Sequence, residues 1–148
     1  MITIPGRLRS AAWDIPYDLA AVCGVRHRVQ EALTSWGLAE LADDVVLVAG
    51  ELLGNAVSHG GPPIRLSLWR TRGALCVRVT DHGTGRPRQL DVGLDAVRGR
   101  GLAIVEALAG EFGIISRDGR PGTVVWAKWA VKHDLAFDRA SVPEQRQP

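Results

Sequence analysis

The spacing of apolar residues switches sharply partway along this 148-residue chain, and the switch constrains its fold more than any other feature. Before Gly60 the apolar residues recur every three or four positions, as on one side of an α-helix. From Ile64 they alternate with other residues, as along a β-strand. The intervening Gly-Gly-Pro-Pro sequence at 60–63 ends a helix firmly. Helices and a sheet must therefore pack against each other.

The same spacing predicts the individual elements. A first helix is expected at about 18–36, ended by Gly37, and a second at about 39–59. The remaining predicted elements are a strand within 7–15, a hairpin of strands 64–69 and 75–80, a third helix at 102–109, and a hairpin of strands 112–117 and 123–130. These elements predict an α/β two-layer sandwich, in which a mixed, mostly antiparallel sheet carries three helices on one face.

Length and charge predict one domain and exclude some functions. We expect an arm and first strand at 1–15, the main domain at 16–130, and a flexible tail at 131–148. The net charge is only +2 and no basic block occurs, so direct nucleic-acid binding is not expected. No apolar run approaches the roughly 20 residues that cross a bilayer, and no signal peptide is recognisable. We therefore expect a cytoplasmic protein without a membrane contact.

Glu51 and Asn55 interrupt the otherwise apolar second helix. Because they are four positions apart, their side chains lie on one face. Gly50 and Gly54 each cost about 0.5–1 kcal/mol relative to alanine in a helix interior, which predicts close packing beside them. A carboxylate beside an amide suits Mg²⁺ and a water molecule. The alternative is the polar edge of an amphipathic helix.

Asp81 is a carboxylate on a predicted core face. Counting by twos from Leu75 places it with the buried side chains, at the end of the strand. As an acceptor it needs a donor, which a ligand's exocyclic amine or a backbone N–H can supply. Gly83 and Gly85 follow in the sequence Asp-His-Gly-Thr-Gly and permit close approach by a ligand. An ordinary Asx-type strand exit is the alternative.

A third motif is the sequence Arg-Gly-Arg-Gly-Leu from Arg98 to Leu102, directly before the third predicted helix. Free backbone N–H groups at a helix start bind phosphate, and flanking arginines strengthen such a site. A plain loop is the alternative for this motif alone. Chance rarely supplies all three motifs in this order.

Together the motifs resemble those of the GHKL ATPases. Glu51-Leu-Leu-Gly-Asn55-Ala is similar to their N box, Asp81-His-Gly-Thr-Gly85 to their first glycine box, and Gly99-Arg-Gly101-Leu to their second. The similarity covers about residues 16–130. The small size and the Trp-Gly-Leu sequence at 36–38 most resemble the stand-alone anti-sigma-factor serine kinases and their actinobacterial relatives.

The resemblance implies a Bergerat ATP-binding fold with defined residue roles. Asp81 holds the adenine with support from Thr123, Asn55 bridges Mg²⁺ to the triphosphate, and Glu51 is the general base. The phosphates lie under a lid that ends at the second glycine box. Further residues that the resemblance places at the nucleotide are Gly83, Gly85, Gly99, Arg100, Gly101 and Leu102.

The resemblance also implies a function: a protein-serine kinase and anti-sigma factor. Such a protein binds a sigma factor and phosphorylates a serine of a STAS-type anti-sigma-factor antagonist. The alternatives are an ATP-binding regulatory module without phosphotransfer and an interaction domain without nucleotide; Glu51 favours a catalyst. A sensor histidine kinase is disfavoured, because His27 is followed by Arg-Val-Gln, unlike a phosphoacceptor box.

Two further residue types yield expectations. Trp36 and Trp126 are predicted to lie in the core, whereas an exposed Trp69 or Trp129 would mark a dimer or partner surface. His82 has no metal-ligand spacing, so it is predicted to be a surface residue or a hydrogen-bonded core residue.

Overall fold

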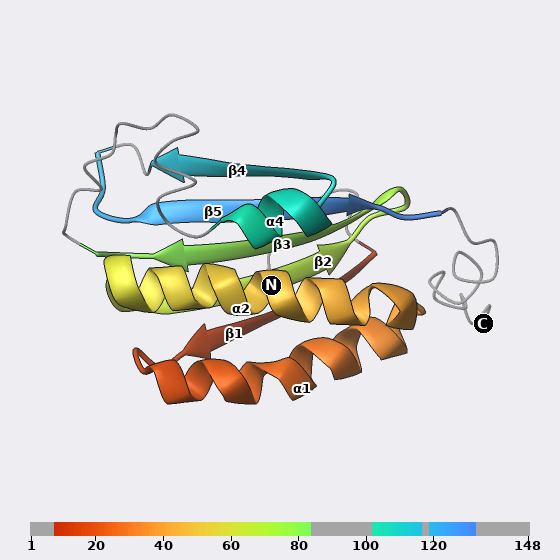
Figure 1. Cartoon of the computed structure of the whole chain (residues 1–148), viewed down its shortest axis with the longest axis horizontal. Helices are drawn as coiled ribbons and strands as arrows, with labels where there is room; N and C mark the ends of the chain where they lie inside the picture. Colours follow the sequence, from red (N-terminus) through yellow and green to blue (C-terminus); the bar gives the residue numbers. More distant parts are fainter. Residues whose placement is uncertain (1–7, 84–101, 117–118, 133–148) are drawn as a thin grey trace, which may run out of the picture.

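The computed structural model describes residues 8–83, 102–116 and 119–132. Within these residues, five strands form one sheet in the order β1-β2-β3-β5-β4, and the helices cover one of its faces (Figure 1). Every pairing between neighbouring described strands is antiparallel. The predicted two-layer α/β sandwich is confirmed, with an antiparallel sheet in the described residues.

The elements occur in the predicted order. Their bounds are β1 Arg9–Ile15, α1 Leu19–Ser35, α2 Ala42–His59, β2 Ile64–Arg70, β3 Ala74–Asp81, α4 Ala103–Leu108, β4 Glu111–Ser116 and β5 Thr123–Ala130. The predicted second helix begins later as an α-helix, because Ala39–Leu41 forms a short 3-10 helix, η1. All other predicted boundaries agree within about two residues.

Both ends of α1 follow from local sequence signals. The Asp18 side chain caps the first turn by accepting a hydrogen bond from the N–H of Ala20, at 2.9 Å. At the other end Gly37 has a φ of +75°, and the N–H of Leu38 donates to the carbonyl of Leu33 at 2.8 Å. This is a Schellman motif, in which glycine takes the left-handed position and the next apolar residue enters the core. Gly37 therefore ends the helix as predicted.

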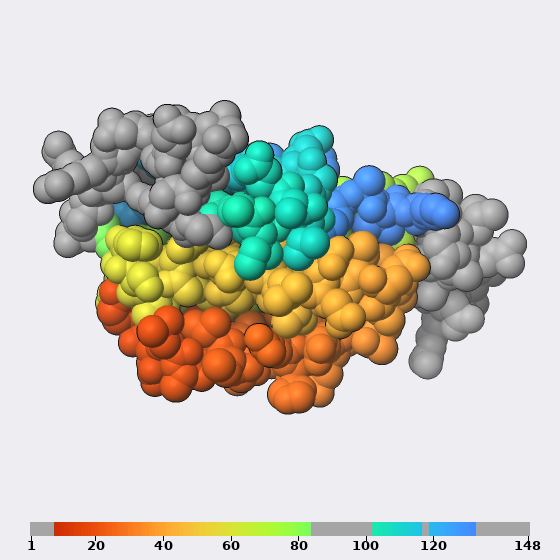
Figure 2. Space-filling model, viewed as in Figure 1, coloured from red at the N-terminus to blue at the C-terminus, as the bar shows by residue number. Residues whose placement is uncertain are grey.

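Helix α2 lies in the middle of the helical layer, between α1 and α4 (Figures 1 and 2). Its inner side packs on the central strands and contributes much of the hydrophobic core. Each fully buried Val or Leu side chain contributes about 1.5–3 kcal/mol, so this layer holds α2 firmly in place. The fully buried residues of α2 and the central strands include Val45, Val48, Leu52, Leu53, Leu66, Leu68, Leu75 and Val77.

The tryptophans differ in how deeply they are buried. Trp36 and Trp129 are buried, and the indole N–H of Trp129 donates to the carbonyl of Leu108 at 2.9 Å. Trp69 and Trp126 are half-buried. Trp126 precedes the fully buried Ala127, so strand alternation turns its ring away from the helices. The prediction of a core Trp126 was therefore wrong, and the buried Trp129 does not mark a dimer or partner surface.

Arg70 is a buried cation that connects the end of β2 to the end of α1. Its side chain is 2% exposed, and its Nη1 donates to the carbonyl of Trp36 at 2.7 Å. Trp36 is the C-cap of α1, where free carbonyls and the helix dipole favour a cation. Arg70 thus stabilises the junction between the helical layer and the sheet.

We expect Arg70→Met to lower the free energy of unfolding by about 1–3 kcal/mol, because it leaves a buried carbonyl without this donor. Methionine keeps most of the packing of the arginine stem. Arg65→Met is the control: it breaks only the exposed ion pair with Asp14, which is worth about 0–1 kcal/mol. Urea unfolding of both variants measures the difference. Equal stability of the two variants would contradict the role of Arg70.

Candidate functional site

Three segments meet at one end of the sheet: the C-terminus of α2, the last residue of β3 and the first residue of β5 (Figure 1). Asp81 and Thr123 are directly paired across β3 and β5. Both are buried, although both side chains are polar. Buried polar side chains at strand ends require partners, so this end of the sheet is the candidate site.

The Asp81 carboxylate is only partly used by the protein. Its Oδ1 accepts the N–H of Gly83 at 3.0 Å, which is the Asx-type strand exit considered from the sequence. Within the described part of the chain, no hydrogen bond to Oδ2 is found. A buried carboxylate with free lone pairs favours a ligand that brings an N–H donor. Oδ1 of Asp81 therefore forms the Asx-type strand exit, and Oδ2 is available to accept a hydrogen bond from a ligand.

Glycines surround Asp81 at contact distance. A Cβ added at Gly60 would lie 2.5 Å from Cγ of Asp81, and one at Gly61 would lie 2.7 Å from Cα of Gly83. Gly122, with a φ of +112°, would place its Cβ against the carbonyl oxygen of Asp81. The helix stops before Gly60 as predicted, but Gly60 has a φ of −101° rather than a left-handed conformation. Glycine is needed there because the carboxylate occupies the side-chain position.

Glu51 and Asn55 occupy one side of α2, one turn apart. Both are half-buried, so neither is enclosed in the core. The Nδ2 atom of Asn55 is nevertheless buried and has no hydrogen-bond partner among the described residues. An α-helix rises 1.5 Å per residue, which places Asn55 roughly 7–8 Å and Glu51 roughly 13–14 Å from Gly60 along the axis. Asp81, which lies against Gly60 beyond the end of α2, Asn55 and Glu51 thus follow one another along the direction of the helix.

The glycines of α2 do not have the predicted role. A Cβ built at Gly50 or at Gly54 meets no described atom within 4 Å outside the adjoining backbone. No described protein atom therefore provides the close packing that the sequence predicts beside them. Their helix-propensity cost is not offset by a tight contact with another described element.

A hollow of about 200 Å³ lies between α1 and α2, and Glu51 is among its lining residues. Cys23, Arg26 and Leu47 also line it and are exposed, so the hollow borders the surface. The other lining residues are mainly apolar: Val22, Val25, Val29, Val46, Ala49, Gly50 and Leu53. Glu51 is therefore accessible from the side of α1.

Both glycine motifs are only partly described. Gly85, Gly99, Arg100 and Gly101 lie outside the described residues, so their predicted contacts stay predictions. Leu102 precedes α4 and is 1% exposed, within the hydrophobic core. Its side chain anchors α4, which leaves its backbone as the part that could meet a ligand.

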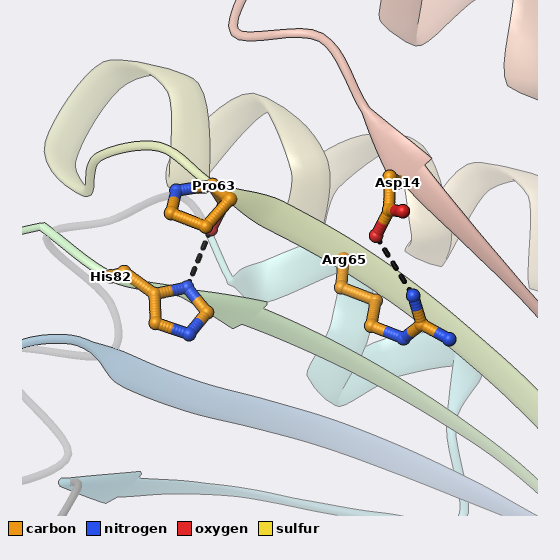
Figure 3. A network of polar contacts seen from close by, with 4 residues as sticks. All are labelled: Asp14, Pro63, Arg65 and His82. Carbon is orange, nitrogen blue, oxygen red and sulfur yellow. Dashed lines mark hydrogen bonds and ion pairs between the residues drawn. The ribbon is translucent and has the colours of Figure 1, made fainter.

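Sequence reasoning missed residues that hold the site together. The backbone N–H of His82 donates to the carbonyl of Gly61 at 2.9 Å, and its Nδ1 lies 2.6 Å from the carbonyl of Pro63 (Figure 3). The Tyr17 hydroxyl donates to the carbonyl of Gly60 at 3.3 Å. Two adjacent glycines, where one suffices to end a helix, were the available signal for Gly60 and Gly61. Nothing in the sequence indicated the contacts of His82 or Tyr17.

The arrangement fits a nucleotide with a magnesium ion. Asp81 offers a buried acceptor for a base amine, and Asn55 offers an amide whose nitrogen has no hydrogen-bond partner among the described residues. Among the described residues, no group of three or more His, Cys, Asp or Glu side chains could hold a metal by itself. Mg²⁺ commonly takes one or two protein oxygens and completes its shell with phosphates and water. The donor set therefore suits an ion that arrives with phosphate.

No helix in the described ranges is both long and apolar enough to cross a membrane.

Comparisons with known proteins identify the family of the domain. Residues 15–129 match the family model of the histidine kinase-like ATPase domain. A segment of 79 residues is 35% identical to the signal transduction histidine-protein kinase AfsQ2 of Streptomyces coelicolor. That segment is 53% of this chain but spans only 13% of the relative. The family match covers most of the chain and supports an ATP-binding regulatory role. The chain belongs to the family of histidine kinase-like ATPase domains.

Proposed function

We propose that this chain binds ATP with Mg²⁺ and acts as an anti-sigma factor with protein-serine kinase activity. The carrying observation is the buried Asp81 carboxylate within its glycine cradle, in line with Asn55 and Glu51 along α2. This order matches the parts of the proposed ligand, from the base through the phosphates to the acceptor hydroxyl. Each part then faces a group of suitable chemistry.

The base is recognised by Asp81. Its Oδ1 is committed to Gly83, so Oδ2 accepts from the exocyclic amine of adenine. Guanine presents a carbonyl oxygen at the corresponding position, which repels a carboxylate. The buried Thr123, paired with Asp81 on β5, supports the same end of the site. The site therefore selects ATP over GTP.

The phosphates are placed beside Asn55. Its Oδ1 would hold Mg²⁺, which neutralises phosphate charge when it is bound. The Nδ2 of the same amide has no partner within the described ranges, and it donates to a phosphate oxygen or to water. Gly85, Gly99, Arg100 and Gly101 are proposed to close over the triphosphate.

Glu51 acts on the acceptor hydroxyl. A serine Oγ attacks the γ-phosphorus of ATP, and a new O–P bond forms while the bond from that phosphorus to the bridging oxygen breaks. ADP leaves with the electron pair, and Glu51 takes the serine proton. Glu51 is half-buried and lines the hollow beside α1, so a protein side chain can reach it.

The proposed acceptor is a serine on a STAS-type anti-sigma-factor antagonist. Phosphorylation adds about −1.5 to −2 charges, which releases the antagonist and leaves this chain free to bind a sigma factor. The sequence resemblance supports these partners, and we also propose a cytoplasmic location and a homodimer. The similarity to a histidine kinase covers too little of that protein to carry over its activity.

ATP titration with and without Mg²⁺ tests the proposal. The wild type is expected to bind ATP below millimolar concentration with Mg²⁺, and Asn55→Ala to lose about tenfold of that affinity. Gln30→Ala, which truncates a half-buried amide on α1, is the matched control and keeps wild-type affinity. Absence of ATP binding by the folded wild type at millimolar concentration contradicts the proposal. Binding without transfer to any antagonist would leave a regulatory module without kinase activity.

A further inference from the structure

His82 makes two hydrogen bonds to the segment that joins α2 to β2. Its backbone N–H donates to the carbonyl of Gly61 at 2.9 Å, and its Nδ1 lies 2.6 Å from the carbonyl of Pro63 (Figure 3). The carbonyl can only accept, so Nδ1 carries the proton in this contact. One residue thus ties the exit of β3 to the α2–β2 connection at two points.

The two segments also touch without intervening side chains. A Cβ at Gly83 would lie 2.6 Å from the carbonyl carbon of Gly60 and from the nitrogen of Gly61. Gly60 in turn occupies the space against the Asp81 carboxylate. On the other side, the Tyr17 hydroxyl donates to the carbonyl of Gly60. The position of the carboxylate relative to α2 therefore depends on how these backbones are held together.

We propose that His82 is a positioning residue for the nucleotide base, acting through Asp81; this inference rests on the proposed ATP binding. The imidazole hydrogen bond to Pro63 holds segment 81–83 against segment 60–63. This contact fixes the distance between the Asp81 carboxylate, which reads the base, and the α2 side chains that meet the phosphates. A binding site requires its groups to be held within about 0.5 Å of the productive geometry. Glycine segments cannot supply that rigidity by themselves.

Three variants test the inference. His82→Ala removes the ring hydrogen bond but keeps the backbone one, and it is expected to weaken ATP binding about three- to tenfold. His82→Ala is also expected to lower the ratio of ATP affinity to GTP affinity by a similar factor. The reason is that the displaced carboxylate accepts less well from the adenine amine. His82→Asn places an amide N–H donor near the position of Nδ1 and is expected to restore affinity to within about twofold. Arg65→Ala, which removes the exposed ion pair with Asp14 on the adjacent strand, is the control and keeps both values (Figure 3).

Measurements are made below the unfolding transition of each variant, with the folded fraction checked by circular dichroism. Wild-type affinity and an unchanged ATP-to-GTP ratio in His82→Ala overturn the inference. Loss of thermal stability alone, with the ratio unchanged, also overturns it, because that result indicates a purely structural role. Failure of the wild type to bind ATP overturns the proposed function instead, so the two failures are distinguishable.

Discussion

Glu51→Gln is expected to reduce phosphotransfer to the acceptor protein by about 10²–10⁴-fold, the usual contribution of a general base. Glutamine has the shape of glutamate but does not take a proton from the attacking hydroxyl. Affinity for ATP stays within about twofold, because the proposed contacts to base and phosphate belong to Asp81 and Asn55. Single-turnover transfer from labelled ATP, beside an ATP titration, measures both quantities.

Glu31→Gln is the matched control for this substitution. Glu31 is exposed on α1, so the same loss of charge occurs away from the site. Its transfer rate should equal that of the wild type. If Glu51→Gln transfers phosphate at the wild-type rate, Glu51 is not the base, and the role of its hollow must be reconsidered. If Glu51→Gln loses both phosphotransfer and ATP binding, Glu51 instead contacts the phosphates.

Asp81→Asn should weaken ATP binding by about 10- to 150-fold, or about 1.5–3 kcal/mol, the value of a hydrogen bond to a charged group. Asparagine keeps an oxygen to accept from Gly83, so the turn after β3 survives. Its amide N–H₂ then faces the adenine amine, and two donors oppose each other. Isothermal titration with ATP measures the loss, and thermal unfolding checks the fold.

Asp14→Asn provides the comparison for this change. Asp14 also lies near the end of a strand, but its side chain is 84% exposed and only its ion pair with Arg65 is lost. Affinity for ATP should be unaffected. If Asp81→Asn binds ATP as tightly as Asp14→Asn, Asp81 does not read the base and the proposed orientation of the nucleotide is wrong.

Much of the fold was predictable because its signals are local. The Asp18 cap, the Gly37 Schellman motif and the alternation in the hairpin strands each depend on residues that are near neighbours in sequence. The face of the sheet on which a side chain lies was predictable only by comparison with other residues of the same strand. Asp81 was placed correctly because Leu75, Val77 and Val79 precede it at even spacing. Trp126 was misplaced because its strand has apolar side chains on both faces.

The sequence predicted which residues form the motifs of the candidate site, but it did not predict the contacts that these residues make. Glu51, Asn55 and Asp81 stand out because polar groups interrupt apolar patterns. The degree of burial of Glu51 and Asn55 did not follow, since it depends on how α1 and α4 flank α2. The closeness of Gly60 to Asp81 did not follow either, because 20 intervening residues have to fold back through a hairpin before the two meet.

The sequence by itself determined the order of elements, the layer architecture and the three polar motifs, because periodicity and turn chemistry operate over a few residues. Only the tertiary structure decided that His82 binds the Pro63 carbonyl, that Arg70 caps α1, and that glycines enclose the Asp81 carboxylate. The physical reason is that these contacts join residues from different elements. Helix packing and strand register bring them within hydrogen-bond distance, and neither is encoded in a local pattern.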